Sequence, residues 1–278
     1  MSISILLAVL AAAFLHASWN ALIKLGTSKL GTMVILSLTE VPLGLAVGLN
    51  RPMIGHQVWP WLLASAAIHL AYKTFLTIAY RHGDLSRVYP IARGAAPIGV
   101  LLVGGWLLAD RVAPTEVAGI VILGTGILMM ARGVFTGGEE RRMLPFALGS
   151  AAATAAYTLV DGMGARVAVD ALAYVAWMFV LDGCLFSLGA LALNGAAILP
   201  RRGRDWAQGA VASAASYAAY SISVWAMTRA PIALVAALRE TSILFAVLIG
   251  WLAFGERLGA EKALSALLIV AGVMVTRL

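Results

Sequence analysis

The chain has 278 residues, of which 62% are hydrophobic and 12% are charged, with a formal net charge of +7. A soluble domain carries about 25% charged residues, so this composition excludes an ordinary water-soluble protein and indicates that the chain lies in a bilayer. The basic residues are scattered through short polar stretches, so we expect no nucleic-acid partner.

Apolar stretches recur along the whole chain. A membrane-spanning helix needs about 20 mostly apolar residues, and ten segments meet this requirement when the chain is divided at its polar separators. Lipid offers a backbone amide no partner outside its own helix, so we predict an all-α integral membrane protein with ten transmembrane helices. In chain order the segments cover 3–24, 31–49, 59–80, 86–109, 114–132, 144–164, 170–194, 206–228, 231–254 and 259–277.

The separators are short and rich in loop-forming residues, as in RHGDLSR at 81–87 and LPRRGRD at 199–205. Lys and Arg favour cytoplasmic loops, and most of them lie in the odd-numbered separators. The even-numbered separators and the C-terminus hold only Arg51, Arg111, Arg166, Arg229 and Arg277. We therefore expect a multi-pass protein of the inner (plasma) membrane with both termini outside.

An internal repeat relates the two halves of the chain. The stretch 99–132 aligns with 245–277 at an offset of 146, which also places Arg93 on Arg239, and a weaker match sets ASWN at 17–20 on AAYT at 155–158. Each half holds five segments, and because five is odd the halves enter the membrane from opposite sides. We predict an N-terminal five-helix repeat over 1–135 and a C-terminal inverted repeat over 143–278, within one membrane domain.

Polar side chains form stripes at helical spacing on the first, third, fourth, sixth, eighth and ninth segments. Such stripes predict that these six helices surround a central cavity, with the fifth and tenth segments packed behind them. The GLAVG stretch at 44–48 is typical of close helix packing, either within the chain or in a dimer. A monomer or a homodimer is compatible with these features.

The acidic–basic pairs that end the fourth and ninth segments, in LLADRV at 107–112 and LAFGERL at 252–258, are a further signature. Together with the five-plus-five repeat they resemble the drug/metabolite transporter superfamily, EamA type, over essentially the whole chain. The resemblance implies a pseudo-twofold bundle of ten helices with a central cavity, alternating access and small metabolites as substrates. Known members include bacterial amino-acid exporters, drug exporters and plastid sugar-phosphate translocators.

Three basic residues, Lys73, Arg93 and Arg239, lie inside apolar segments. A charge at the bilayer centre costs about 2.5–3.5 kcal/mol on insertion scales and marks a substrate or ion path, so we expect these residues to hold a carboxylate or phosphonate. The alternative is structural pairing, of Arg239 with Glu240 of a facing helix or of Arg93 with Asp161. The other predicted substrate-binding residues are Trp19, Asn20, His69, Tyr72, Tyr89, Tyr157, Tyr217 and Glu240.

Several chemistries have no motif in the chain. There is no G-x-x-x-x-G-K-[ST] for a nucleotide, no metal-ligand spacing among the four histidines and one cysteine, and no G-x-S-x-G arrangement. We therefore expect no catalytic residue, no metal and no cofactor.

The first hypothesis is a secondary transporter that works by alternating access and exports amino acids, the direction of transport resting on the resemblance alone. The runner-up is a carrier of organic phosphates or phosphonates, because three basic groups suit a dianion. From another class, the chain would be a membrane scaffold or an intramembrane enzyme. The expected partners are a small-molecule substrate and the lipid bilayer.

Overall fold

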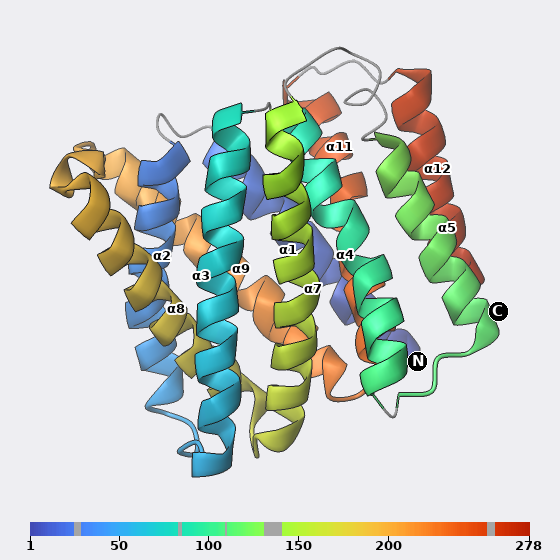
Figure 1. The fold of residues 1–278 in the computed structure, drawn as a ribbon, viewed down its shortest axis with the longest axis horizontal. Coiled ribbons are helices and arrows are strands. Elements are labelled where there is room, and N and C mark those ends of the chain that lie inside the picture. Colours follow the sequence, from blue (N-terminus) through green and yellow to red (C-terminus); the bar gives the residue numbers. More distant parts are fainter. Residues whose placement is uncertain (25–28, 83–84, 109, 131–140, 255–258) are drawn as a thin grey trace. The chain divides into compact units, whose positions relative to one another are not determined.

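The structure is a computed structural model that describes residues 1–24, 29–82, 85–108, 110–130, 141–254 and 259–278 (Figure 1). Over these residues the chain is built from helices, which confirms the all-α prediction. The α-helices are α1 (Ile3–Lys24), α2 (Lys29–Gly48), α3 (Trp59–His82), α4 (Leu85–Leu107), α5 (Pro114–Met130), α7 (Leu144–Val167), α8 (Ala171–Asn194), α9 (Gly203–Met227), α10 (Ile232–Arg239), α11 (Ser242–Phe254) and α12 (Ala260–Val275). Short 3₁₀ helices cover His56–Val58, Arg141–Met143 and Ala196–Ile198.

Each of the ten predicted segments coincides with helix, and the ninth is divided into two helices. The break falls at Glu240 and Thr241, whose backbone N–H groups donate to the carbonyls of Ala237 and Leu238, each at 3.1 Å. This three-residue spacing is that of a 3₁₀ turn. The Thr241 hydroxyl also donates to the Leu238 carbonyl at 2.7 Å, which is the local competition for backbone groups that ends helices at such residues.

Five helical stretches within the described residues are long and apolar enough to cross a membrane, judged by length and composition: Ile3–Leu22, Leu30–Gly48, His56–Ala79, Ala171–Asn194 and Ile232–Ala253. Three further apolar stretches, Ile91–Leu107, Pro114–Met129 and Ala263–Val275, are shorter. The helices α7 and α9 are of spanning length but carry the Thr, Tyr, Ser and Asp residues of the predicted polar stripes.

The chain forms two compact units. Unit 1 comprises Met1–Leu70 and Val160–Arg229, and unit 2 comprises Ala71–Leu159 and Ala230–Leu278. Each unit takes segments from both halves of the sequence, and α3 and α7 contribute residues to both. The division into repeats at 1–135 and 143–278 is a statement about sequence equivalence, and it stays a prediction.

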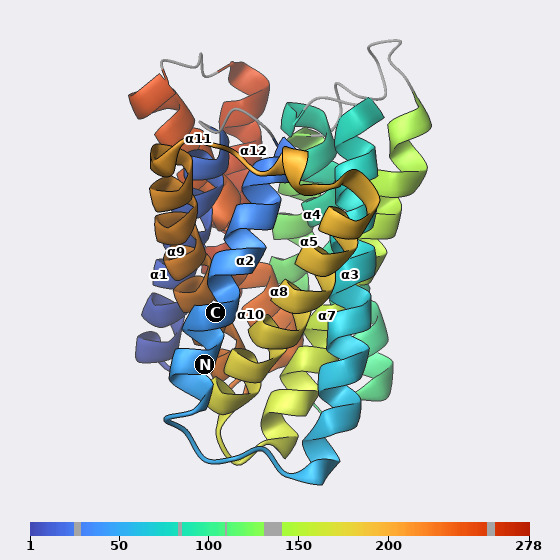
Figure 2. The same cartoon turned by 90° about the vertical axis from the view of Figure 1, so that its left-hand side faces the viewer.

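In unit 1, α2 packs against α8 and α9, and α1 packs against α9 (Figure 2). The interface of α2 with α8 depends on two glycines. A Cβ atom on Gly44 would lie 2.7 Å from the carbonyl oxygen of Ala176, and one on Gly183 would lie 2.6 Å from the carbonyl oxygen of Ser37. These backbones therefore approach as closely as glycine allows, and the packing predicted for 44–48 occurs within the chain.

In unit 2, α5 packs against α12 and α4, and α4 also packs against α10 (Figure 1). A Cβ atom on Gly119 would lie 2.7 Å from the Gly272 carbonyl oxygen, and one on Gly126 would lie 2.9 Å from that of Ser265. The lower-numbered glycine of α5 thus contacts the higher-numbered residue of α12, and the reverse holds for the second pair. The two helices therefore run antiparallel.

The acidic residue that ends the fourth predicted segment stabilises the start of another helix. The Asp110 Oδ2 atom accepts a hydrogen bond of 2.9 Å from the backbone N–H of Ile232, the first residue of α10. A carboxylate at this position satisfies a backbone donor that has no partner inside the helix and complements the positive end of the helix dipole. The corresponding pair, Glu256 and Arg257, lies outside the described residues.

Candidate functional site

A buried cluster of charges lies in unit 2 at the break between α10 and α11. Arg93 of α4 donates from Nε to Glu240 Oε2 at 2.9 Å. The other carboxylate oxygen, Oε1, lies 3.6 Å from Nε of Arg239. Nη2 of Arg239 reaches the hydroxyl of Thr158 on α7 at 3.4 Å. We call Arg93, Arg239, Glu240 and Thr158 the arginine–glutamate cluster.

The arginine–glutamate cluster is enclosed by protein. Arg93 and Arg239 are each 3% exposed, Glu240 is 1% exposed, and Thr158 is fully buried. An isolated charge in such surroundings is too costly to persist unless it is paired and hydrogen-bonded. Two guanidinium groups face one carboxylate, so the cluster carries a formal charge of +1.

The break in the helix explains how neighbouring residues join the same cluster. On a regular helix Arg239 and Glu240 project about 100° apart, and only one of them could point toward a given partner. Here α10 ends at Arg239, and Glu240 lies in the turn before α11. The Glu240 carboxylate thereby contacts both arginines. The acidic partner of Arg239 is thus its direct neighbour in the chain and not a residue of a facing helix.

Structural pairing of the buried arginines is therefore present, and the acidic partner of Arg93 within unit 2 is Glu240. Asp161 belongs to unit 1, so its expected pairing with Arg93 stays a prediction. Periodicity indicates which face and depth a side chain occupies, and it leaves the choice between two acidic partners open.

Four further predicted site residues also belong to unit 2. Lys73 on α3 is buried, with 6% of its surface exposed. The rings of Tyr72 and Tyr157 meet edge to face, with centroids 5.4 Å apart and an interplanar angle of 73°. Tyr89 lies within α4, and its side chain lies outside the described residues.

A second buried network is centred on Asp161 in unit 1. Oδ1 of Asp161 accepts a hydrogen bond of 2.9 Å from the hydroxyl of Tyr174. Oδ2 accepts from the hydroxyl of Tyr220 and lies 3.0 Å from Nε2 of His69. These residues come from α7, α8, α9 and α3, and the His69 ring stands edge-on to the Tyr220 ring at 5.9 Å. We call these four residues the Asp161 network.

Asp161 is fully buried, and its partners account for its tolerance there. A buried carboxylate needs hydrogen bonds to replace those of water, and here three side chains from three other helices supply them. The network therefore ties four helices of unit 1 to one acidic group. It also places the imidazole of His69 against a carboxylate.

The remaining predicted residues lie in unit 1 and make local contacts. The indole Nε1 of Trp19 donates to Nδ1 of His16 at 3.2 Å, and Nδ2 of Asn20 donates to the His16 carbonyl at 2.8 Å. Tyr217 is 8% exposed and packs on Phe179, with ring centroids 5.1 Å apart. These three belong to the helix packing of unit 1. The Phe179 ring also lies 5.7 Å from the ring of Tyr220, so Tyr217 is connected to the Asp161 network through Phe179.

Sequence reasoning did not select Asp161, Tyr174 and Tyr220 as site residues. Asp161 is the only acidic residue of α7 and lies on its polar stripe, so a signal existed. Tyr220 lies on the polar stripe of the eighth segment. Tyr174 had no comparable signal, because it is a single tyrosine in the strongly apolar α8.

A helical chain with apolar stretches of spanning length and with charges buried among its helices is a multi-pass membrane protein. Residues 141–278 match the EamA-like transporter family. The C-terminal half of the chain is therefore that of an EamA-like transporter, a family of the drug/metabolite transporter superfamily whose members transport small molecules.

Comparison with solved structures supports the fold. The chain is similar to a protein of known crystal structure with a TM-score of 0.79 and 21% sequence identity, covering 99% of this chain and 98% of that chain. At this identity the similarity concerns the fold alone. No curated protein matches the chain.

Proposed function

We propose that the protein is a secondary transporter that moves small zwitterionic metabolites by alternating access, with amino-acid export as its activity. The observation that carries this proposal is the arginine–glutamate cluster, in which two guanidinium groups and one carboxylate are buried beside a break in a helix. Buried charges inside membrane helices usually belong to a substrate or ion path.

The cluster offers both charges that an amino acid requires. A substrate carboxylate can take the place of the Glu240 carboxylate at a guanidinium group, with bidentate hydrogen bonds where the geometry allows. The Glu240 carboxylate so released can then accept the substrate ammonium. A phosphate or phosphonate dianion would instead face the like charge of Glu240, which favours the zwitterion over the runner-up substrate class.

Two sets of helix contacts support the inverted repeat on which alternating access depends. Gly119 and Gly126 correspond to Ser265 and Gly272 at the repeat offset of 146. When the two halves are exchanged, the close contact of Gly119 with Gly272 therefore becomes the close contact of Ser265 with Gly126. Because α5 and α12 are antiparallel, a two-fold axis that exchanges the halves accounts for both contacts.

The contact of α2 with α8 has the same symmetry. Gly183 and Ala176 follow Gly44 and Ser37 by 139 positions each, an offset close to the 138 of the match between 17–20 and 155–158. The approach of Gly44 to Ala176 thus corresponds to that of Gly183 to Ser37. Ten transmembrane helices in two inverted repeats are the arrangement that these contacts favour, and in such carriers substrate lies near the bilayer midplane.

Transport into proteoliposomes tests the proposal. Purified protein is reconstituted, and uptake of radiolabelled amino acids is compared with uptake of a labelled aminoalkyl phosphonate, with protein-free liposomes as the baseline. We expect amino-acid uptake that Arg239→Gln reduces at least tenfold and that Arg277→Gln, a change at an exposed arginine near the C-terminus, leaves unaltered. Uptake of the phosphonate alone would favour the runner-up, and uptake of neither compound would contradict both.

A further inference from the structure

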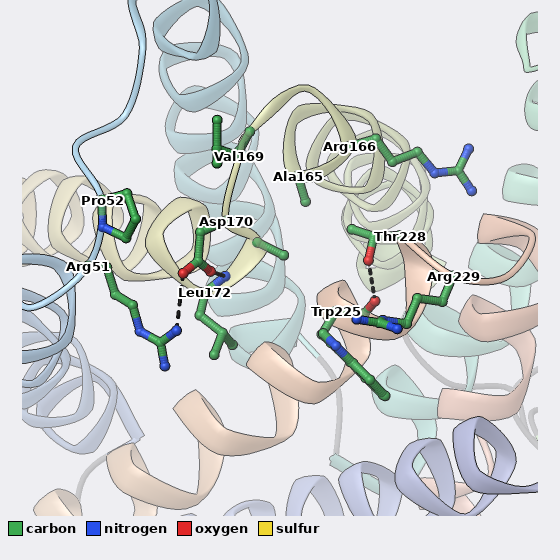
Figure 3. A pocket seen from close by; sticks show the side chains of 12 residues that line it. Arg51, Pro52, Ala165, Arg166, Val169, Asp170, Leu172, Trp225, Thr228 and Arg229 are labelled. Atoms are coloured by element: carbon green, nitrogen blue, oxygen red, sulfur yellow. Dashed lines mark hydrogen bonds and ion pairs between the residues drawn. The ribbon is translucent and has the colours of Figure 1, made fainter.

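A pocket with a volume of about 550 Å³ opens at one end of unit 1 (Figure 3). Its walls come from the residues after α2, the end of α7, the turn between α7 and α8, and the end of α9. Figure 3 shows Arg51 and Asp170 on one side of the pocket and Trp225, Thr228 and Arg229 on another. The volume falls within the range of small-molecule sites, roughly 300–1,000 Å³.

The pocket wall is strongly basic. It contains three arginines, Arg51, Arg166 and Arg229, and the carboxylate of Asp170, which gives a formal charge of +2. Arg51 Nη1 lies 3.1 Å from Asp170 Oδ2. The Arg229 guanidinium lies over the Trp225 ring, 4.9 Å from its centroid.

These contacts fix the positions of the three guanidinium groups. Each guanidinium carries five N–H donors in a planar fork, and the contact of Arg51 with Asp170 engages one of its terminal nitrogens. Nε of Arg166 donates to the Met227 carbonyl at 2.9 Å, which fixes its stem to the end of α9. The Arg229 guanidinium is held against the Trp225 ring, a contact that does not use its N–H groups as hydrogen-bond donors to another side chain.

The position of these arginines in the sequence gives a second argument. All three lie in or beside the even-numbered separators, where basic residues are scarce: these separators and the C-terminus hold five arginines and no lysine. Three of those five line this one pocket. Membrane topology disfavours basic residues on that side, so their concentration here calls for a local function.

We propose that this pocket binds an oxyanion, the phosphate or carboxylate group of a small organic molecule or of a lipid head group. The guanidinium forks match the geometry of such groups. The Trp225 indole and the neighbouring Ala, Val and Leu residues form an apolar wall for the organic part. The residues of this pocket are not those of the arginine–glutamate cluster, and binding here does not depend on transport.

Calorimetric titration with phenyl phosphate, which combines an oxyanion with an aromatic ring, measures binding by a soluble ligand. The purified protein is placed in nanodiscs of phosphatidylcholine, a lipid without net charge. We expect Arg51→Gln and Arg229→Gln each to raise Kd about tenfold, because each removes charge-assisted hydrogen bonds. Arg277→Gln and Arg111→Gln remove exposed arginines that do not line the pocket, and they should leave Kd unchanged.

A second arm tests the lipid source. The same variants are purified with phosphatidylglycerol, and native mass spectrometry counts the lipid molecules that each retains. Loss of one bound lipid in both pocket variants, but not in the controls, would assign the oxyanion to a head group, and titration by phenyl phosphate would assign it to a solute. Either result supports the oxyanion site. Equal behaviour of pocket and control variants in both arms, with unchanged melting temperatures, overturns it.

Discussion

Arg93 and Glu240 are 147 positions apart in the chain, and Arg93 Nε donates to the Glu240 carboxylate at 2.9 Å. The repeat offset of 146 aligns Arg93 with Arg239, so Glu240 directly follows the counterpart of Arg93. One carboxylate thus serves two arginines that occupy equivalent positions in the two halves of the sequence. The halves are not equivalent at the next position, where Glu240 corresponds to Gly94. This difference supplies the carboxylate that both arginines contact.

Glu240→Gln is expected to destabilise the protein by about 3–5 kcal/mol. The substitution leaves two buried guanidinium groups beside a neutral amide, and removal of one partner from a buried ion pair costs about this much. The measurement is the free energy of unfolding in mixed micelles, followed by circular dichroism during titration with a denaturing detergent.

The double variant Arg93→Gln with Glu240→Gln serves as the control for this prediction. It removes one charge of each sign, so its destabilisation should be smaller than the sum of those of the two single variants. An additive result would show that Arg93 and Glu240 do not interact energetically.

Arg239→Lys is expected to lower amino-acid transport while leaving the fold intact. Lysine keeps the positive charge, but it cannot reach the Glu240 carboxylate and the Thr158 hydroxyl with one planar group. We expect an increase in apparent KM of about tenfold in the proteoliposome assay. Transport that is equal to that of the unsubstituted protein would place Arg239 outside the substrate path.

Gly44→Ala and Gly183→Ala are each expected to destabilise unit 1 by about 1–3 kcal/mol. The added methyl group would meet a backbone carbonyl oxygen of the partner helix at less than 3 Å, and overpacking of this kind forces backbone shifts. Thermal unfolding of the purified variants checks the effect, and their similar magnitude is itself part of the prediction.

Gly189→Ala is the matched control on α8. A Cβ atom there would meet nothing within 4 Å, and replacement of glycine by alanine in a helix is favourable by up to about 1 kcal/mol. The control should therefore be neutral or stabilising. If Gly189→Ala were as destabilising as Gly183→Ala, the cause would lie within the helix itself and not in the contact between helices.

Tyr174→Phe and Tyr220→Phe should each lower the free energy of unfolding by about 1–2 kcal/mol, since each removes one hydrogen bond to Asp161. Asp161→Ala should cost more than either, because three donors lose their acceptor at once. Unfolding of the double variant Asp161→Ala with Tyr174→Phe provides the check: once Asp161 is absent, loss of the Tyr174 hydroxyl should have little further effect.

The distribution of Lys and Arg predicts that the C-terminus lies outside the cytoplasm. Alkaline phosphatase fused after Leu278 should be active in intact cells, since this enzyme folds only in the oxidising space outside the inner membrane. Green fluorescent protein fused at the same position should be dark. A fluorescent fusion with an inactive phosphatase would reverse the orientation.

The positions of the helices could be predicted because apolar length is a property of each segment by itself. The break at Glu240 could not be predicted with the same ease, because the run from Pro231 to Phe254 is apolar on both sides of it. The four consecutive polar residues at 239–242 were the only signal, and periodicity alone treats them as positions on one helix. The turn arises from local hydrogen bonds together with the tertiary pairing of Glu240 with Arg93.

The residues of the arginine–glutamate cluster could be selected because a charge in an apolar segment is unusual at any position. The partner of each charge was harder to predict, since Asp161 was the expected partner of Arg93 and Glu240 was the expected partner of Arg239. The choice depends on which helices are neighbours in a unit, and the units combine segments from both halves of the chain. Tyr174, which completes the Asp161 network, became visible only through that packing.

Because the Glu240 carboxylate is part of the protein chain, it stays beside the two arginines throughout the transport cycle of the proposed carrier. In the proposed carrier, Glu240 acts as a tethered counter-ion that neutralises a guanidinium group whenever no cargo is bound. The unloaded protein then carries one uncompensated guanidinium group rather than two during its return step. Such a design favours net flux down a gradient over obligate one-for-one exchange, because reorientation does not require a second solute to travel back.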